Sequence, residues 1–411
     1  SVQNLWKELE KNDDIYLSKY SGWYSVSDEA FYTNEEIEEV DGKKLAISSK
    51  SPVEWMDEES YFFRLSKWEK PLLDYYEKNP DFISPSSRRN EVISFVKSGL
   101  KDLSISRKSF SWGIPVPSNK DHVIYVWLDA LTNYISALNY PNMNDPLFKR
   151  FWPASIHLIG KDILRFHAVY WPAFLLAAKI PLPKKIYGHG WILSDEEKMS
   201  KSKGNILDPI KIIDKYGLDP LRYYLIKEVS FGNDGNISQE RLEDCINSDL
   251  ANNFGNLCQR VTSFAIKNCN GKIPNEIEFE KDDLKILDNF KLNINLIRDK
   301  IDKQDVNYYI NFIINALFET NKYFNDQEPW SKKNNLIRLN TIVYTTLEIV
   351  RKISYMLYPI IPQSSLKALE IFNIKESEIK FSTIDNHNYL ETNKKINKID
   401  ILFKKIEKKN D

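Results

Sequence analysis

A loop near the middle of the chain alternates lysines with hydroxyl residues. From position 198 it reads Lys198-Met199-Ser200-Lys201-Ser202-Lys203-Gly204-Asn205. Lysines supply point charges that stabilise negative charge on a departing pyrophosphate, while hydroxyl and backbone N–H groups donate hydrogen bonds to phosphate oxygens. The residue types therefore favour a triphosphate ligand, although charge alone is also consistent with a solvated surface loop.

A glycine and an aspartate follow a short apolar run. The run at 156–159 is expected to form a strand that ends at Gly160, and Asp162 is expected to open the next helix. Ligands of open α/β sheets bind at the carboxyl ends of the strands, where glycine permits close approach. Both residues are therefore candidates for ligand contact, with a helix N-cap as the alternative role of Asp162.

The segments around these residues predict an α/β domain followed by helices. Apolar runs at 123–128, 156–159 and 186–193 are separated by helix-length segments, which is the spacing of a parallel sheet. Beyond Pro220 the strand signals fade and apolar residues recur with the 3.6-residue period. The second half of the chain is therefore expected to be all-helical.

The two ends of the chain have patterns of their own. Alternating aromatic and polar residues over 15–51 predict a small β-rich insertion of antiparallel strands, and helices are expected over 61–78 and 89–100. The last stretch, 394–411, has seven lysines against three acidic residues and little that could anchor a core. We expect it to be a solvated terminal helix or tail.

Composition excludes several classes of protein. The 411 residues include 57 basic and 58 acidic side chains, so any contact with a polyanion must come from local patches. Cys245, Cys258 and Cys269 are far apart and lack metal-ligand spacing, which leaves neither a disulfide framework nor a zinc knuckle. No apolar run is long enough to cross a bilayer and no signal-peptide pattern opens the chain, so we expect a cytoplasmic protein without a membrane partner.

Several longer strings carry a resemblance to a known family. The pentapeptide at 198–202 resembles the signature loop of the class I aminoacyl-tRNA synthetases. Segments over residues 106–115 and 157–163 resemble ones that the methionine, leucine, isoleucine and valine enzymes of that class share. Within that group, residues 126–134, 166–167, 255–260 and 326–330 resemble the methionyl-tRNA synthetases. The resemblance, to the bacterial type, runs from about Val2 to about Ile371 and thus covers nearly the whole chain.

The resemblance implies an enzyme that ligates L-methionine to tRNA(Met) through a methionyl-adenylate, using ATP and Mg²⁺. It implies catalytic roles on the departing phosphates for Lys198, Ser200, Lys201 and Ser202. It implies ATP contacts for Gly160, Asp162, His189 and Lys201.

The resemblance also implies a methionine pocket. A thioether carries no charge, so its selective binding needs a shaped aromatic cage with one or two polar groups. Trp127, Ala130 and Ile163 are expected to line this cage, and Tyr134 and His167 to supply the polar groups. Their spacing fits shared helix faces, while ordinary core packing is the alternative for each.

For the tRNA, the resemblance implies anticodon contacts by Asn256, Arg260, Pro329 and Trp330. Unpaired bases are read by stacking on aromatic rings and by hydrogen bonds along their edges. Trp330 is the candidate platform, and Asn256 and Arg260 present an amide and a guanidinium one helical turn apart. Alternatively, Trp330 is the last core residue before a charged loop.

One motif of the class is missing. Class I enzymes carry a His-x-Gly-His string, whereas the five histidines here, at 122, 157, 167, 189 and 387, lack the needed neighbours. We therefore expect that an amino-terminal part is lacking and that residues 1–411 alone show little pyrophosphate exchange. Residues 13–60 contain no cysteine, so no zinc is expected in the insertion.

The resemblance predicts an α/β plus all-α fold, namely an incomplete Rossmann-like parallel-sheet catalytic domain with a small β-rich insertion, followed by an α-helical anticodon-binding bundle. The expected parts are 1–115 (insertion and flanking helices), 116–235 (second half of the catalytic domain), 236–375 (anticodon-binding helices) and 376–411 (Lys-rich tail). Two alternatives stay open. One is another class I synthetase, although the module at 13–60 is too small for the editing insertion of the branched-chain enzymes. The other is a non-catalytic tRNA-binding protein.

Overall fold

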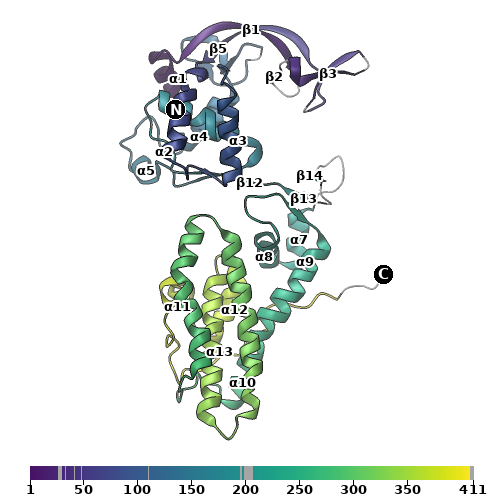
Figure 1. Ribbon diagram of the computed structural model, residues 1–411, viewed down its shortest axis with the longest axis vertical. Coiled ribbons are helices and arrows are strands. Elements are labelled where there is room, and N and C mark those ends of the chain that lie inside the picture. The colour runs from purple at the N-terminus through teal and green to yellow at the C-terminus, as the bar shows by residue number, and fades with distance from the viewer. Residues whose placement is uncertain are drawn as a thin grey trace. The chain divides into compact units, whose positions relative to one another are not determined.

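The chain divides into two compact units, Ser1–His189 and Gly190–Asp411. The computed structural model describes residues 1–25, 30–32, 34–40, 42–47, 49–109, 111–194, 197–198 and 207–407 (Figure 1). Each unit has its own hydrophobic core. The first combines sheets with helices and the second is mainly helical, so the predicted fold class is confirmed, while the finer boundaries at 115, 235 and 375 stay predictions.

A long antiparallel hairpin dominates the insertion. Strand β1 (Ile15–Ser25) pairs along its length with β5 (Glu54–Phe63), and the sheet has the order β2-β1-β5-β7. The other strands of this region are β2 (Ala30–Tyr32), β3 (Ile37–Val40), β4 (Lys43–Ala46) and β7 (Leu103–Ser104). The predicted β-rich insertion is therefore present.

The helix predicted over 61–78 is wrong in its first part. Residues 61–63 belong to β5, and helix α2 (Glu69–Lys78) starts only after a 3₁₀ turn. Three consecutive aromatic residues fit a pleated strand better than a helix, because aromatic side chains pack well against cross-strand neighbours. Helix α3 (Ser86–Lys97) confirms the second predicted helix, with a start three residues earlier than expected.

Three short parallel strands form the sheet that carries the candidate ligand residues. The order is β11 (His157–Gly160), β12 (Ile186–His189) and β6 (Ile83–Ser84). Gly160 and His189 are register partners at the carboxyl ends of their strands. The sheet thus places both residues at the edge where ligands of α/β folds bind.

The apolar run at 123–128 does not join this sheet, contrary to the prediction. Strand β10 (Asn119–Ile124) lies antiparallel between β8 (Ser106–Arg107) and β9 (Pro115–Val116). The chain turns helical at Val126, where α4 begins. The run is therefore half strand and half helix, two states that a short apolar stretch does not distinguish by periodicity.

The remaining helices of the first unit cover its core. They are α1 (Val2–Lys11), α4 (Val126–Ser136), α5 (Pro146–Phe151) and α6 (Trp171–Ala177), with a π-helical segment, Phe166–Tyr170, before α6. The buried face of α1 contacts α4 and α6. Helix α4 is therefore packed against the amino-terminal helix.

The second unit contains three short strands, two at its start and one after α8, and is otherwise helical. Strand β13 (Ile192–Ser194) pairs antiparallel with β14 (Glu197–Lys198) and parallel with β15 (Gly235–Ile237). The helices are α7 (Pro209–Tyr216), α8 (Leu218–Glu228), α9 (Gln239–Cys245), α10 (Asn256–Asn268), α11 (Lys281–Asp302), α12 (Val306–Asp326), α13 (Leu336–Leu357) and α14 (Pro362–Leu369). A π-helical segment, Ile246–Gly255, links α9 to α10.

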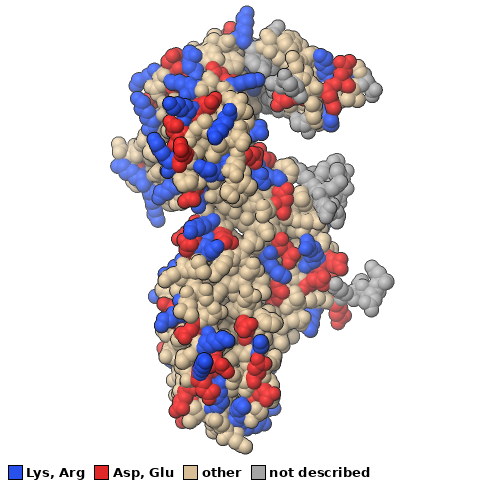
Figure 2. Space-filling view, in the orientation of Figure 1, with Lys and Arg blue, Asp and Glu red and all other residues tan. Residues whose placement is uncertain are grey.

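Helix α13 is the central element of the bundle. It is buried along nearly its whole length and contacts α10, α11, α12 and α14 (Figure 1). On the face of the bundle shown in Figure 2, basic and acidic side chains are interspersed. No helix in the described part of the chain is long and apolar enough to cross a membrane.

The prediction of a solvated tail is wrong for residues 394–407. Ile396, Ile399 and Phe403 are buried in the core of the bundle. The segment has no helix within these residues, and the Ile396 amide donates to the Gly271 carbonyl at 2.8 Å. These three buried apolar side chains therefore anchor the irregular segment 394–407, which we call the strap, while its lysines are exposed to solvent.

Candidate functional site

The carboxyl ends of β11 and β12 bring together three predicted ATP contacts. A Cβ atom built on Gly160 would lie 2.5 Å from Asp162 Oδ1 and 3.9 Å from His189 Cε1. Asp162 is exposed and lies inside the 3₁₀ turn Lys161–Ile163, whose N-cap is Gly160, so the alternative role of Asp162 as an N-cap is wrong. A glycine at this point leaves room for a ligand against the strand end.

Helix α4 and the turn after β11 bring together residues that the sequence predicts to form a methionine cage. The Tyr134 hydroxyl lies 2.8 Å from His167 Nε2, and His167 Nδ1 lies 3.0 Å from the Ile163 carbonyl oxygen. Because a carbonyl only accepts, Nδ1–H donates to Ile163 and Nε2 accepts from Tyr134. Burial lowers the pKa of His167, which keeps this neutral tautomer at physiological pH. Three of the predicted residues are thus joined in one hydrogen-bonded chain.

Trp127 contacts the other predicted cage residues through Phe166, which was not among the residues predicted to line the cage. Its indole stacks on Phe166, with ring centroids 3.5 Å apart and planes at 11°. Phe166 directly precedes His167 in the sequence, so the stacked rings lie next to the hydrogen bonds that link Tyr134, His167 and Ile163. Ala130 lies between Trp127 and Tyr134 on α4 and is exposed, which leaves the space above it open to a ligand.

An aromatic layer beneath Tyr134 was not predicted. The His157 ring lies 4.1 Å from the Tyr134 ring, measured between centroids, and the rings of Trp152 and Trp171 complete the layer. Trp171 follows His167 by four residues and thus continues the row of Ile163 and His167, a spacing that could have identified it. Nothing in the local sequence marks His157.

The loop at 198–205 is described only at its start. Lys198 is placed as the end of β14, where it pairs with Leu193 in the antiparallel register. Ser200, Lys201 and Ser202 lie outside the described residues. Their proposed roles on the phosphates therefore stay predictions.

The predicted anticodon contacts meet at one end of the bundle. Arg260 Nη2 donates to Asn325 Oδ1 at 2.7 Å, and its guanidinium carbon lies 4.9 Å from the centroid of the Phe324 ring. The same Phe324 ring is 6.2 Å from the Trp330 ring, which is 45% exposed. Arg260 and Trp330 therefore both contact the Phe324 ring.

The other two predicted anticodon residues have different surroundings. Asn256 is exposed at the start of α10, one turn before Arg260, as the spacing predicts. Pro329 is buried at the first position of the short turn that carries Trp330. The alternative of Trp330 as a core residue does not fit its exposure, and Pro329 shapes the turn rather than presenting a surface.

The described residues contain no group of three or more His, Cys, Asp or Glu side chains that could hold a metal ion. Within the described ranges, therefore, no set of side chains fits the coordination of a metal ion.

Two family models match the chain, one described as "tRNA synthetases class I (M)" over residues 1–262 and one as the anticodon binding domain of methionyl tRNA ligase over residues 273–411. A Brucella suis protein named methionine–tRNA ligase is 50% identical over 384 residues, which are 93% of this chain and 74% of that protein. A Rickettsia felis protein of the same name is 48% identical over 415 residues, covering 99% and 79%. A solved structure of Mycobacterium tuberculosis methionyl-tRNA synthetase in complex with methionyl-adenylate has a TM-score of 0.93 at 44% identity, covering 98% of this chain and 80% of that one.

Proposed function

This chain belongs to the methionyl-tRNA synthetases of class I, enzymes that ligate methionine to tRNA, and from that premise we propose that it forms a methionyl-adenylate from ATP and transfers methionine to tRNA(Met) in the cytoplasm. The adenylate bound to the Mycobacterium tuberculosis relative supports this route. The arrangement of Gly160, Asp162 and His189 at adjoining strand ends supports a nucleotide site in this chain.

In the proposed first step, the methionine carboxylate attacks the α-phosphate of ATP in line and pyrophosphate leaves. A hydroxyl of the terminal ribose of the tRNA then attacks the methionyl carbonyl of the adenylate, the bond to the phosphate breaks, and AMP leaves. No protein nucleophile is required, so the chain contributes positioning and charge stabilisation. Lys198, Ser200, Lys201 and Ser202 would act on the departing phosphates. Mg²⁺ would enter as the counter-ion of ATP, and no step is assigned to it.

The observation that carries the proposal is the hydrogen-bonded chain from Tyr134 through His167 to Ile163, beside the stacked Trp127 ring. The Tyr134 proton and the His167 proton are both donated within the cage. The cage therefore presents aromatic surface and no net charge, which favours an uncharged, polarizable thioether over a charged side chain.

The anticodon site is the second part of the proposal. The half-exposed Trp330 ring offers a stacking surface, and Arg260 and Asn256 offer donors and acceptors to a base edge. The face of the bundle shown in Figure 2 carries mixed charges, and the whole sequence has 57 basic against 58 acidic side chains. Recognition would therefore depend on these local contacts rather than on a broad basic surface.

The test is aminoacylation of tRNA by the product of the intact gene with a panel of amino acids. We expect methionine alone to be charged, and we expect Tyr134→Phe to raise the KM for methionine about 10-fold, because it leaves His167 Nε2 without its donor. Tyr75→Phe, a half-buried tyrosine on α2, is the matched control and should leave the KM unchanged. Charging of leucine, isoleucine, valine or cysteine at a comparable rate would overturn the proposal.

A further inference from the structure

Gln327 belongs to the string at 326–330 but has no role in the proposed function. It is the C-cap residue of α12 and immediately precedes the turn that carries Trp330. The next residue, Glu328, has a φ of 44° in the left-handed region, so the chain changes direction sharply at this point. The geometry of Gln327 therefore sets where the turn departs from the helix.

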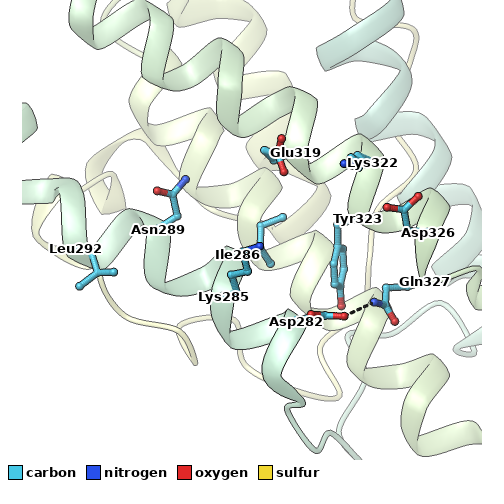
Figure 3. Close-up of a pocket in the computed structure, with 10 residues that line it drawn as sticks. All are labelled: Asp282, Lys285, Ile286, Asn289, Leu292, Glu319, Lys322, Tyr323, Asp326 and Gln327. Atoms are coloured by element: carbon cyan, nitrogen blue, oxygen red, sulfur yellow. Dashed lines mark hydrogen bonds between the residues drawn. The ribbon is translucent and has the colours of Figure 1, made fainter.

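The side chain of Gln327 bridges two other helices. Its Oε1 accepts from Arg338 Nη2 at 2.6 Å. Its Nε2 donates to Asp282 Oδ2 at 3.2 Å, as the dashed line in Figure 3 marks. Asp282 is in the first turn of α11, and Arg338 is in the first turn of α13. One amide thus connects the end of α12 to the starts of both neighbouring helices.

Arg338, one of the two residues that Gln327 bridges, is itself held in a fixed orientation. Arg338 donates to Asp283 through Nη1 at 2.6 Å and Nη2 at 3.0 Å, and both side chains are buried, with exposed fractions of 7% and 0%. The Tyr323 hydroxyl donates to the same carboxylate. Bidentate pairs of this kind fix the direction of the guanidinium, so Arg338 offers Gln327 a donor at a defined position.

The side-chain amide of Gln327 lies between a cavity and the ion pair of Arg338 with Asp283. Gln327 lines a space of about 430 Å³ together with Asp282, Asn289 and Tyr323 (Figure 3). The Trp330 ring is supported on its own side by the edge-on contact with Phe324. Among the described residues, Gln327 is the only side chain of the 326–330 string that forms hydrogen bonds to both α11 and α13.

We propose that Gln327 is a positioning residue for anticodon recognition. By bridging Asp282 and Arg338 it fixes the turn at 328–331 and thereby the direction of the Trp330 indole. The inference depends on the proposed function, in which Trp330 stacks on an anticodon base.

The experiment measures binding of RNA stem-loops to residues 1–411 by fluorescence anisotropy. One stem-loop carries the methionine anticodon and the other an altered anticodon. We expect Gln327→Met to reduce the preference for the methionine anticodon about 10-fold while leaving the affinity for the altered loop unchanged. Gln327→Asn, too short to reach both partners, should behave in the same way. Asn289→Met makes the same kind of neutral change at the same cavity and is the control expected to bind as the unmodified chain does.

A double variant separates positioning from a general structural effect. If Gln327 acts through Trp330, adding Gln327→Met to Trp330→Ala causes no further loss of preference. Additive losses, or an equal loss of affinity for both stem-loops, would overturn the inference, as would unchanged preference in both Gln327 variants. If the unmodified chain itself does not distinguish the two stem-loops, the proposed anticodon site fails, and the inference fails with it.

Discussion

The buried histidine beneath the methionine cage makes stability depend on pH. His157 is 5% exposed, and its Nε2 has no hydrogen-bond partner among the described residues. Burial, with a smaller contribution from repulsion by His167, lowers the pKa of His157 from 6.5 to about 4. The folded protein therefore holds this ring neutral at pH values where the unfolded chain binds a proton.

The size of the effect follows from the two pKa values. Between pH 6.5 and pH 4 the unfolded state binds more protons, so the free energy of unfolding falls as the pH falls. A histidine with a pKa of about 6.5 unfolded and about 4 folded lowers the free energy of unfolding by about 2 kcal/mol at pH 5 and about 3 kcal/mol at pH 4. His157→Leu should remove this loss, and because it also removes an unpaired buried nitrogen it should cost little at pH 7.

Denaturant unfolding monitored by tryptophan fluorescence measures this difference. Eight of the ten tryptophans lie in Ser1–His189, so the signal reports mainly on the first unit. We expect the midpoints of the unmodified chain and of His157→Leu to separate steadily between pH 7 and pH 4. His387→Leu removes a histidine from the second unit and is the control that should leave the transition unchanged. Parallel pH profiles for His157→Leu and the unmodified chain would refute the reasoning.

Three further predictions concern the proposed nucleotide site, the loop at 198–205 and the helical bundle. Gly160→Ala places a Cβ 2.5 Å from Asp162 Oδ1, so pyrophosphate exchange by the intact gene product should show a KM for ATP raised about 10-fold with methionine affinity retained, whereas an unchanged KM would place ATP elsewhere. Lys201→Ala should depress adenylate formation about 100-fold in the same assay without weakening methionine binding, and a loss confined to methionine binding would contradict its role. Asp283→Asn removes the charge opposite buried Arg338 and should lower the free energy of unfolding by about 3 kcal/mol in denaturant titrations; a variant as stable as the unmodified chain would show that the ion pair adds nothing.

The sequence predicts which candidate residues share a helix better than it predicts the elements around them. The spacing of Trp127, Ala130 and Tyr134 places them on one helix, and that helix is α4. Residues three, four or seven positions apart lie on the same face of a helix, so contacts between them can be predicted from the sequence. The His167 bond to Ile163, four residues back, is of this kind.

Contacts between distant segments are where prediction from sequence fails. His157 reaches Tyr134 only because β11 begins beside α4, and no local pattern in the sequence indicates that approach. The burial of Ile396 and Phe403 is similar, since the groove that receives them is built by residues far earlier in the chain. The many lysines of this segment indicate its solvent-exposed side, but composition alone does not show that the apolar residues between them are buried.

The proposed anticodon site shows how such distant contacts can affect binding. Arg260 is a flexible side chain, and holding it in one direction costs conformational entropy when a ligand binds. Here Asn325 accepts its hydrogen bond and the Phe324 ring lies under its guanidinium before any RNA is present. Phe324 also contacts the Trp330 ring, so the orientations of the donor and of the stacking platform depend on one buried side chain. If both contact the anticodon as proposed, much of the ordering cost is met during folding of the bundle, and affinity should depend on the packing of α12 as strongly as on the residues that contact the bases.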